Sequence, residues 1–338
     1  MISAGIVGIA LAGAIYQLVG ASRSRRRYAP PGRMIAVAGE RLHLVCAGHA
    51  GPPVLFEAGI GASSLSWTAV MRDTASFARA CAYDRAGLGW SDPARSPRTV
   101  QQMLCELRGV LTAATGGEPG VLVGHSFGAF LSLVYASRYP RDVAALVLVD
   151  PPSEWRVMTS RQSRMLWGAI QLSRLGAVLA RLGVVRASLA LLTGGAPGVP
   201  RRFARVFGPT AARTLEHLVG EVRKLPADVH PIVQAQWCQP KCFQSMAAHL
   251  GALRETAAAA AESNVRDIPL VVLSAGHHPA AVLAEHREIA RLSPLGRHLV
   301  APESGHWVGL DQPDLVVSAI RDVINTAAML ASSASRLP

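Results

Sequence analysis

The chain has 338 residues, of which half are hydrophobic and 17% are charged, so its bulk is globular and not disordered. Its formal net charge of +12 comes mostly from arginines that are spread along the chain with few aromatic residues between them, which argues against nucleic-acid binding. Five scattered cysteines predict no disulfide framework, and Cys238 and Cys242, without a second ligand pair, match a zinc site poorly. We therefore expect no nucleic-acid partner and no bound metal, and the oligomeric state stays open.

The amino terminus contains an uncharged, largely apolar run from Ile2 to Gly20. A helix of that length rises about 28 Å, which is close to the thickness of a bilayer's hydrocarbon core. The run is followed by "ASRSRRRYAPPG", in which four arginines precede a Pro-Pro-Gly break. We predict a single-pass membrane anchor over residues 2–20, and the arginines on its carboxyl side favour a cytoplasmic location for the rest of the chain.

Two other interpretations of this run stay open. Val19-Gly20-Ala21 resembles a signal-peptidase site, but no basic residue precedes the apolar run, and arginines just after a cleavage site hinder export. A buried core helix is the third interpretation.

Beyond the Pro-Pro-Gly break, short apolar runs alternate with helix-like stretches. The runs "GVLVG", "ALVLV" and "PLVVL" are continuous, which is typical of strands buried on both faces of a parallel sheet. Thr99 and Gln102 resemble a capping box, and the helix that they begin is expected to end at Gly116-Gly117. The sequence predicts an α/β protein with an eight-stranded, mainly parallel sheet flanked by helices. The predicted strands are Met34–Ala38 and Arg41–Cys46, which form an opening hairpin, followed by Val54–Glu57, Ala80–Tyr83, Val121–Val123, Ala145–Val149, Leu270–Leu273 and His298–Val300.

The alternation of strands and helices stops between about Pro152 and Asn264, where helical patterns such as Met165–Gly183 are broken by "TGGAPGVP". An insertion at this point, after the sixth strand, is expected to lie over the edge of the sheet as a helical lid. The predicted organisation is an anchor with a basic linker (1–30), a core (31–151 and 265–330), the lid (152–264) and a carboxy-terminal tail (331–338).

The segment from Gly124 to Gly128 reads Gly-His-Ser-Phe-Gly, with an apolar strand before it and the helix-like "AFLSLVYASRY" after it. Small residues at both ends of Gly-x-Ser-x-Gly let the strand and the helix close around a strained serine, whose hydroxyl is then held above the sheet. In this context Ser126 is predicted to be a nucleophile.

The third strand ends in "LFEAGIGASSLSW", whose glycine-rich turn can direct a backbone N–H toward the oxygen of a tetrahedral intermediate. By position this donor is the N–H of Ile60, and the second donor is the N–H of Phe127, the residue after the predicted nucleophile. A plain glycine turn is the alternative interpretation for Ile60.

Four segments together resemble the α/β-hydrolase fold family: "EAGIGASSLSW", "CAYDRAGLGWSD", "VLVGHSFGA" and "ESGHW". The resemblance covers roughly residues 31–328 and is strongest to bacterial serine esterase-like hydrolases with an amino-terminal hydrophobic segment. It implies an eight-stranded sheet, a serine–histidine–acid triad, no cofactor, and a lid that sets substrate choice. In this family the "DRAGLGWSD" loop mainly shapes the sheet and the edge of the site, so Asp84 and Arg85 are expected to have structural roles.

His306, in "APESGHW" after the eighth strand, matches the position of the family's catalytic histidine and is predicted to be the base. His277 and His278 follow the seventh strand, where they can line the site, but no carboxylate pair accompanies them as a metal site would require. His125 is expected to pack beside the serine without acting as a base.

The acid is where the chain departs from the family's common pattern. Many relatives have an aspartate a few residues after the seventh strand, but here that segment is "LSAGHHPAAVLAEH", and its first carboxylate is Glu285. Asp150, the first residue after "ALVLV", is the position used in other branches of the family, next to the nucleophile's own strand. We predict Asp150 as the acid, with Glu285, Glu154 and Glu303 as alternatives and with a simple cap before Pro151-Pro152 as its non-catalytic interpretation.

The sequence therefore predicts a serine hydrolase that cleaves a carboxylic ester or related acyl bond of a small molecule through an acyl-serine intermediate. A serine nucleophile argues against the epoxide hydrolases and dehalogenases of this fold, which attack with aspartate. A cofactor-free perhydrolase or an acyltransferase would use the same triad. A catalytically silent binding protein at the membrane is an alternative of another class, and its expected sign is a damaged triad.

Overall fold

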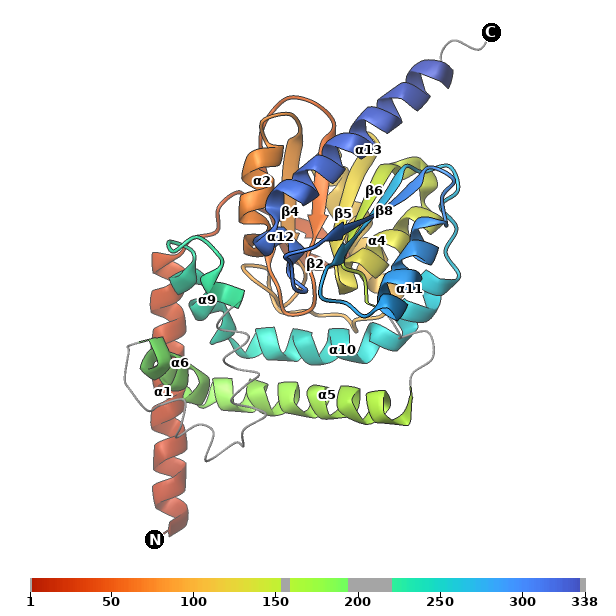
Figure 1. Ribbon diagram of the computed structural model, residues 1–338. Coiled ribbons are helices and arrows are strands. Elements are labelled where there is room, and N and C mark those ends of the chain that lie inside the picture. Colours follow the sequence, from red (N-terminus) through yellow and green to blue (C-terminus); the bar gives the residue numbers. More distant parts are fainter. Residues whose placement is uncertain (1, 153–158, 194–220, 335–338) are drawn as a thin grey trace.

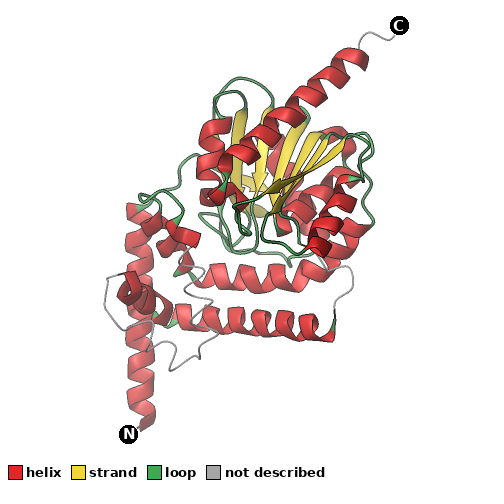
Figure 2. Ribbon diagram, in the orientation of Figure 1, coloured by secondary structure: helices red, strands yellow, loops and turns green. Residues whose placement is uncertain are grey.

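The computed structural model describes residues 2–152, 159–193 and 221–334. Its strands form one sheet in the order β1-β2-β4-β3-β5-β6-β7-β8 (Figures 1 and 2). β2 pairs antiparallel with β1 and with β4, and the remaining neighbours are parallel, which confirms the predicted eight-stranded, mainly parallel sheet. The strands are β1 (Arg33–Val37), β2 (Glu40–Ala47), β3 (Pro53–Glu57), β4 (Arg79–Asp84), β5 (Gly120–His125), β6 (Val143–Val149), β7 (Leu270–Ala275) and β8 (Gly296–Ala301).

Helices cover both faces of the sheet (Figure 2). Along β5, Leu122 packs in a core with α3, α4, α10 and α11, whereas Val121 and Val123 pack on the opposite face with α2 and α13. Because both faces are buried, these strands read as continuous apolar runs in the sequence. The described helices are α1 (Ile2–Arg27), α2 (Thr68–Thr74), α3 (Val100–Thr115), α4 (Phe127–Arg138), α5 (Ser160–Arg181), α6 (Val184–Thr193), α9 (His230–Trp237), α10 (Pro240–Ala261), α11 (Ala280–Ala290), α12 (Val308–Asp311) and α13 (Pro313–Ala334), with short 3-10 helices at Ser64–Trp67 and Pro140–Asp142.

In the part of the chain that the structure describes, α13 is the one helix whose length and composition would allow it to cross a membrane, over Pro313–Ser333 with a mean hydropathy of 1.4. Val316, Ala319, Ile320 and Val323 recur at helical spacing and are buried against the sheet. We therefore interpret α13 as an amphipathic core helix.

The predicted anchor segment lies within α1, a continuous helix that runs through the arginines to Arg27 and ends before the Pro-Pro-Gly break. Its carboxyl half packs against the lid, at α5 and α9. Val7, Ile9 and Leu11 on its amino-terminal half are exposed, so α1 is not a buried core helix. The membrane span itself stays a prediction.

The helical insertion after β6 is confirmed, with α5, α6, α9 and α10 as its described helices. Residues 153–158 and 194–220 of the predicted lid lie outside the described residues. α10 lies between α5 and the core (Figure 1). Two side chains fasten α10 to the loop after β4: Lys241 Nζ donates to the carbonyl of Gly89 at 2.9 Å, and Ser245 Oγ donates to the carbonyl of Ala86 at 2.8 Å.

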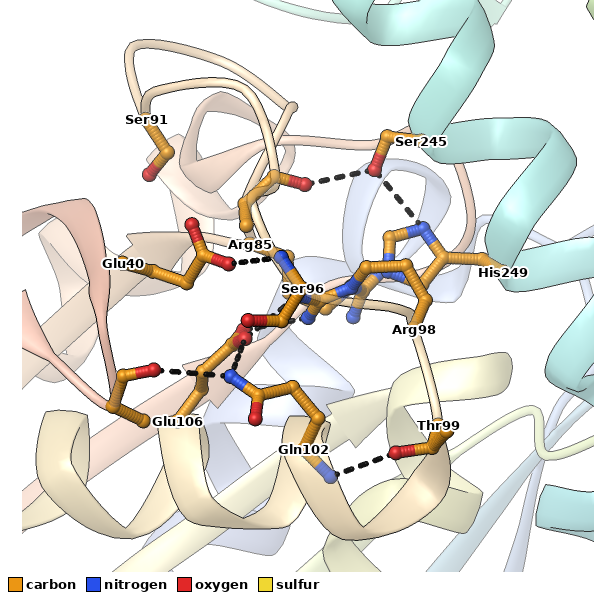
Figure 3. A network of polar contacts seen from close by, with 12 residues as sticks. Glu40, Arg85, Ser91, Ser96, Arg98, Thr99, Gln102, Glu106, Ser245 and His249 are labelled. Atoms are coloured by element: carbon orange, nitrogen blue, oxygen red, sulfur yellow. Dashed lines mark hydrogen bonds and ion pairs between the residues drawn. The ribbon is translucent and has the colours of Figure 1, made fainter.

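A buried ion pair holds the segment that follows this loop (Figure 3). The Arg98 guanidinium donates to both carboxylate oxygens of Glu106 on α3, at 2.6 and 2.5 Å. Gln102 also donates to Glu106, at 3.0 Å. The hydroxyl of Thr99 accepts from the Gln102 N–H, which is one half of the predicted capping box; the Gln102 side chain donates to Ala38 and Glu106, and the Thr99 N–H donates to Pro97 instead. The loop between β4 and α3 is therefore fixed to the core at its carboxyl end, just before α3.

A disulfide joins Cys46 on β2 to Cys81 on β4. The two residues are opposite each other in the antiparallel register of these strands, so strand pairing itself brings the sulfurs together. The sequence predicted no disulfide framework, and this single bond departs from that expectation because only the strand order makes the two cysteines neighbours. Cys105, Cys238 and Cys242 are free thiols.

Candidate active site

Ser126 lies at the sharp turn between β5 and α4, with φ of 54° and ψ of −122°. This region of backbone space is strained for a residue with a side chain. The flanking glycines allow the turn: an added Cβ at Gly124 would lie 2.4 Å from the carbonyl oxygen of Gly128, and one at Gly128 would lie 2.5 Å from the carbonyl oxygen of Glu57. The turn has the geometry of a nucleophile elbow, which presents the serine hydroxyl at the end of the sheet.

The structure brings Ser126, His306 and Asp150 together at the carboxyl ends of β5, β8 and β6. Nε2 of His306 lies 3.1 Å from Ser126 Oγ, and its Nδ1 lies 2.7 Å from a carboxylate oxygen of Asp150. Asp150 is 1% exposed, whereas the His306 side chain is 44% exposed. The three side chains therefore form one hydrogen-bonded chain that leads from a buried charge to an accessible hydroxyl. Their catalytic roles stay predictions.

The Asp150 carboxylate is fixed from several sides. The backbone N–H of Asp150 donates to the carbonyl of Leu273, and the N–H of Ala275 donates to the Asp150 carboxylate at 2.9 Å. Burial disfavours the charged form, but the hydrogen bonds from His306 and Ala275 outweigh burial, and the pKa of this carboxyl group lies below its usual value. Asp150 is therefore ionised at neutral pH.

A second histidine also contacts the acid. Nε2 of His278 lies 2.8 Å and 3.0 Å from the two carboxylate oxygens of Asp150. From the sequence, His277 and His278 were predicted only as residues that can line the site. In the structure the two residues differ: His278 is half-buried and contacts Asp150, whereas His277 is exposed. One local signal was available: both residues follow β7, the strand next to β6.

His125, beside Ser126, supports the loop that carries His306. Its ring packs against the rings of His306 and Trp307, with centroids 4.7 and 4.9 Å apart, and its Nε2 lies 2.8 Å from the carbonyl of His306. Burial, with a smaller effect from His306, lowers the pKa of His125 to about 3. A neutral ring whose Nε2–H donates to that carbonyl holds the His306 backbone in place.

The predicted oxyanion turn runs beside the nucleophile. An added Cβ at Gly59 would lie 3.4 Å from Cβ of Ser126. Ile60 follows in this turn, and Phe127 opens α4. Among the described residues, neither N–H donates a hydrogen bond to a backbone acceptor. The roles of Ile60 and Phe127 stay predictions.

Arg85 fixes the shape of this turn. Its buried guanidinium donates to the carbonyls of Ala58 at 2.6 Å and Gly59 at 2.5 Å, and it pairs with Glu57, which also accepts from the Tyr83 hydroxyl. The carbonyl of Gly59 and the N–H of the next residue belong to one planar peptide and point in opposite directions. By binding the Gly59 carbonyl, Arg85 therefore also sets the direction of the Ile60 N–H. Arg85 was predicted from the sequence to have a general structural role, and its contact with the turn after β3 was not predicted.

Asp84 has a structural position under the same loop. Its buried carboxylate accepts from the backbone N–H groups of Ser64 at 2.6 Å and Trp90 at 2.9 Å, and His43 Nδ1 lies 2.9 Å away. These contacts connect the loop after β4 to the turn after β3.

The alternative acids lie elsewhere. Glu285 on α11 and Glu303 after β8 are exposed, and Glu154 lies outside the described residues. Over the described ranges, no group of three or more His, Cys, Asp or Glu side chains is arranged to hold a metal ion.

Comparisons with known proteins identify the family and the fold of this chain. The profile of a family described as "alpha/beta hydrolase fold" matches residues 52–313. The uncharacterized protein YqjL of Bacillus subtilis is 38% identical over 104 residues, which cover 31% of this chain and 41% of YqjL. The chain spans less than half the length of the first curated relatives that it matches.

Solved structures show the same fold. A thermophilic esterase from Thermogutta terrifontis is similar with a TM-score of 0.59 and 20% identity, over 87% of this chain and 99% of that one. The Cif epoxide hydrolase from Acinetobacter nosocomialis is similar with a TM-score of 0.65 and 16% identity, over 92% of this chain and 96% of that one. Because hydrolases of different chemistry share this fold, the reaction has to be argued from the site.

We expect Asp150→Asn to lower the turnover of an acyl ester by roughly 10⁴, because an amide at this position favours the wrong tautomer of His306. Its thermal unfolding midpoint should stay close to that of the wild type. Turnover of p-nitrophenyl esters and thermal denaturation measure the two effects. Asp267→Asn, which changes an exposed carboxylate, is the matched control and should lose no activity. An Asp150→Asn variant with near wild-type turnover would remove Asp150 from the triad.

Because the pKa of His125 is lowered in the folded state, the free energy of unfolding depends on pH. Between the folded pKa of about 3 and the ordinary histidine value of about 6.5, the unfolded chain binds more protons, so the stabilisation is complete above pH 6.5 and is lost as pH falls. His125→Gln keeps an N–H donor for His306 but does not titrate. From pH 6.5 to pH 5, the wild type should lose about 2 kcal/mol more of its unfolding free energy than this variant.

Urea denaturation at each pH measures this difference. The exposed His49→Gln is the control and should follow the wild-type pH dependence. Parallel pH profiles for the wild type and His125→Gln would show that His125 is not a buried neutral group.

Proposed function

The chain belongs to the alpha/beta hydrolase fold family, and from that premise we propose that it is a serine hydrolase that cleaves a carboxylic ester, or a related acyl bond, of a small molecule. The observation that carries the proposal is the hydrogen-bonded chain from Ser126 through His306 to the buried Asp150. The proposed reaction uses no cofactor.

In the first half of the proposed reaction, Ser126 Oγ attacks the acyl carbon while His306 Nε2 takes the hydroxyl proton. The carboxylate of Asp150 accepts from Nδ1–H, which fixes the tautomer and stabilises the imidazolium that forms. The carbonyl oxygen becomes an oxyanion, and the N–H groups of Ile60 and Phe127 donate to it. When this intermediate collapses, His306 returns the proton to the leaving oxygen, the alcohol departs, and the acyl group stays on Ser126.

In the second half, a water molecule gives a proton to His306 and attacks the acyl carbon of the acyl-serine. The second tetrahedral intermediate uses the same two N–H donors. Its collapse releases the carboxylic acid and returns the proton to Ser126. A perhydrolase or an acyltransferase would differ only in the second nucleophile. The intact geometry of the triad argues against a catalytically silent binding protein.

We also propose that α1 anchors the chain in a membrane as a single pass, with the hydrolase domain on the cytoplasmic side. The exposed apolar side chains of Val7, Ile9 and Leu11 support the anchor, and the arginines from Arg23 to Arg27 support the sidedness.

Ser126→Ala tests the acyl-enzyme reaction. We expect this variant to lose covalent labelling by a fluorophosphonate and to lower turnover by roughly 10⁵–10⁶, because no acyl-enzyme can form. Mass spectrometry of the labelled protein and turnover of p-nitrophenyl esters of graded chain length give the two readouts. Ser76→Ala, at an exposed serine on another loop, should keep both labelling and turnover. Unchanged turnover in Ser126→Ala would exclude the proposed mechanism.

Protease added outside intact cells should leave the hydrolase domain uncut, because the proposed orientation keeps it in the cytoplasm. Opening the cells with detergent should make the domain sensitive to the same protease. A mature protein that begins near Ser22 would instead establish a cleaved signal peptide.

A further inference from the structure

The half of α5 that faces away from α10, called its outer face here, carries several large apolar side chains that water reaches. The inner face packs on α10, with Ser173, Ala177 and Ala180 buried. Exposed apolar groups of this size and number on one helix indicate a binding surface. The residues are Met165, Trp167, Leu172, Leu175 and Val178, with exposed fractions between 48% and 64%.

The same helix is strongly basic. Arg161, Arg164, Arg174 and Arg181 are exposed along α5, and the helix contains no Asp or Glu. The helices α1 and α6, which adjoin it, also contain no acidic residue. Arginines beside Trp and Leu on an exposed amphipathic helix are typical of helices that lie in the interface of a bilayer. The charge of this region complements anionic lipid headgroups.

α1 is held tightly against the turn between α5 and α6. An added Cβ at Gly13 would lie 2.2 Å from the carbonyl oxygen of Leu182, and one at Gly183 would lie 2.5 Å from the carbonyl oxygen of Gly13. The two backbones are therefore in direct contact. Beside this contact, Arg186 Nε donates to the buried side chain of Gln17 at 2.9 Å. The angle between α1 and α5 is thus fixed by packing and by a polar contact.

This contact determines which way the apolar surfaces face. The amino-terminal half of α1 extends past α5 on the side away from the sheet, and among the described lid helices α5 is the outermost on that side (Figures 1 and 2). The exposed Val7, Ile9 and Leu11 of α1 therefore project beyond the outer face of α5. The two helices give one side of the molecule an apolar and basic surface.

We propose that the outer face of α5 lies on an anionic lipid bilayer, with its apolar side chains at the boundary between headgroups and acyl chains and with the part of α1 before Gly13 inserted beside it. In this arrangement residues 13–20 of the predicted span lie against the lid and not in the hydrocarbon core, so the inserted residues 2–12 rise about 16 Å. The lid is then the layer of the protein that faces the membrane, and the sheet with Ser126 is held above it. This proposal goes beyond the anchor, because it assigns the membrane contact to the lid, and it does not depend on the reaction at Ser126.

A second copy of the chain is the competing occupant of this surface. A two-fold symmetric dimer places the same patch on both partners. The arginines of α5 would then face each other with no acidic residue on either helix. Because like charges at close range repel, the charge of the face favours lipid over a second copy.

The test places a fluorescent reporter on the full-length protein in vesicles. Leu175→Cys is labelled with an environment-sensitive dye in a Cys105→Ser background, which removes the exposed native thiol. Ser126→Ala is included so that no lipid is hydrolysed. Vesicles contain equal parts of phosphatidylglycerol and phosphatidylcholine, with a nitroxide quencher near the headgroups. Met329→Cys on α13, which is 70% exposed, is the matched control, and Ile9→Cys reports on α1.

We expect emission from position 175 to shift to shorter wavelength and to be quenched by the nitroxide lipid, while position 329 stays unquenched. Replacing Arg164 and Arg174 by alanine, or omitting phosphatidylglycerol, should reduce the quenching at 175 by more than about twofold, because the anionic attraction is lost. Quenching at position 9 with none at position 175 would show that α1 inserts without the lid and would overturn the proposal. A dye shift at 175 that needs no lipid and rises with protein concentration would identify a second copy as the occupant.

Discussion

The buried carboxylate of Asp150 is the charge on which the geometry of the site depends. Taking a carboxylate out of water is costly unless donors replace the lost hydration. Here the donors come from the end of β7 through Ala275, from the next loop through His278, and from the loop after β8 through His306. Because β6 lies between β5 and β7, this one charge aligns three separate segments with the nucleophile. The hydrogen bond from His306 that helps replace the lost hydration of the Asp150 carboxylate therefore also positions the His306 ring.

Arg85 has the corresponding role on the other side of the nucleophile. Its buried cation orders the turn after β3 by binding two backbone carbonyls, just as the buried anion orders the loops after β7 and β8. Ser126 lies between the two, at a backbone angle that the flanking glycines permit. The lid adds contacts of its own, because its Lys224 pairs with Asp311, whose carboxylate accepts from the N–H of Gly305 beside His306.

Local patterns were enough to predict the strands and the strained turn at Ser126, because each depends on a few adjacent residues. His306 was predicted from the resemblance to the family, and the structure brings it to Ser126, while the roles of both residues stay predictions. Asp150 was predicted from its position at the end of β6, and the structure brings it to His306. His278 could not be separated from His277, since the register of β6 and β7 alone decides which ring meets the carboxylate. The contact of Gly13 with Gly183 was equally hidden, because it joins segments far apart in the chain and has no pattern of its own.

The disulfide between Cys46 and Cys81 has a consequence for the unfolded chain. It closes a loop across a sequence separation of 35 residues, which includes β3 and the turn that Arg85 orders. By chain entropy, a cross-link of this span raises the free energy of the denatured ensemble by about 3–4 kcal/mol, because fewer conformations are open to it. In the cytoplasm, which is the side of the membrane proposed for this domain, thiols are kept reduced and the fold lacks this contribution. An oxidising environment allows the disulfide to form and adds this contribution. The free energy of unfolding of the same fold therefore takes two values, set by the redox state of its surroundings.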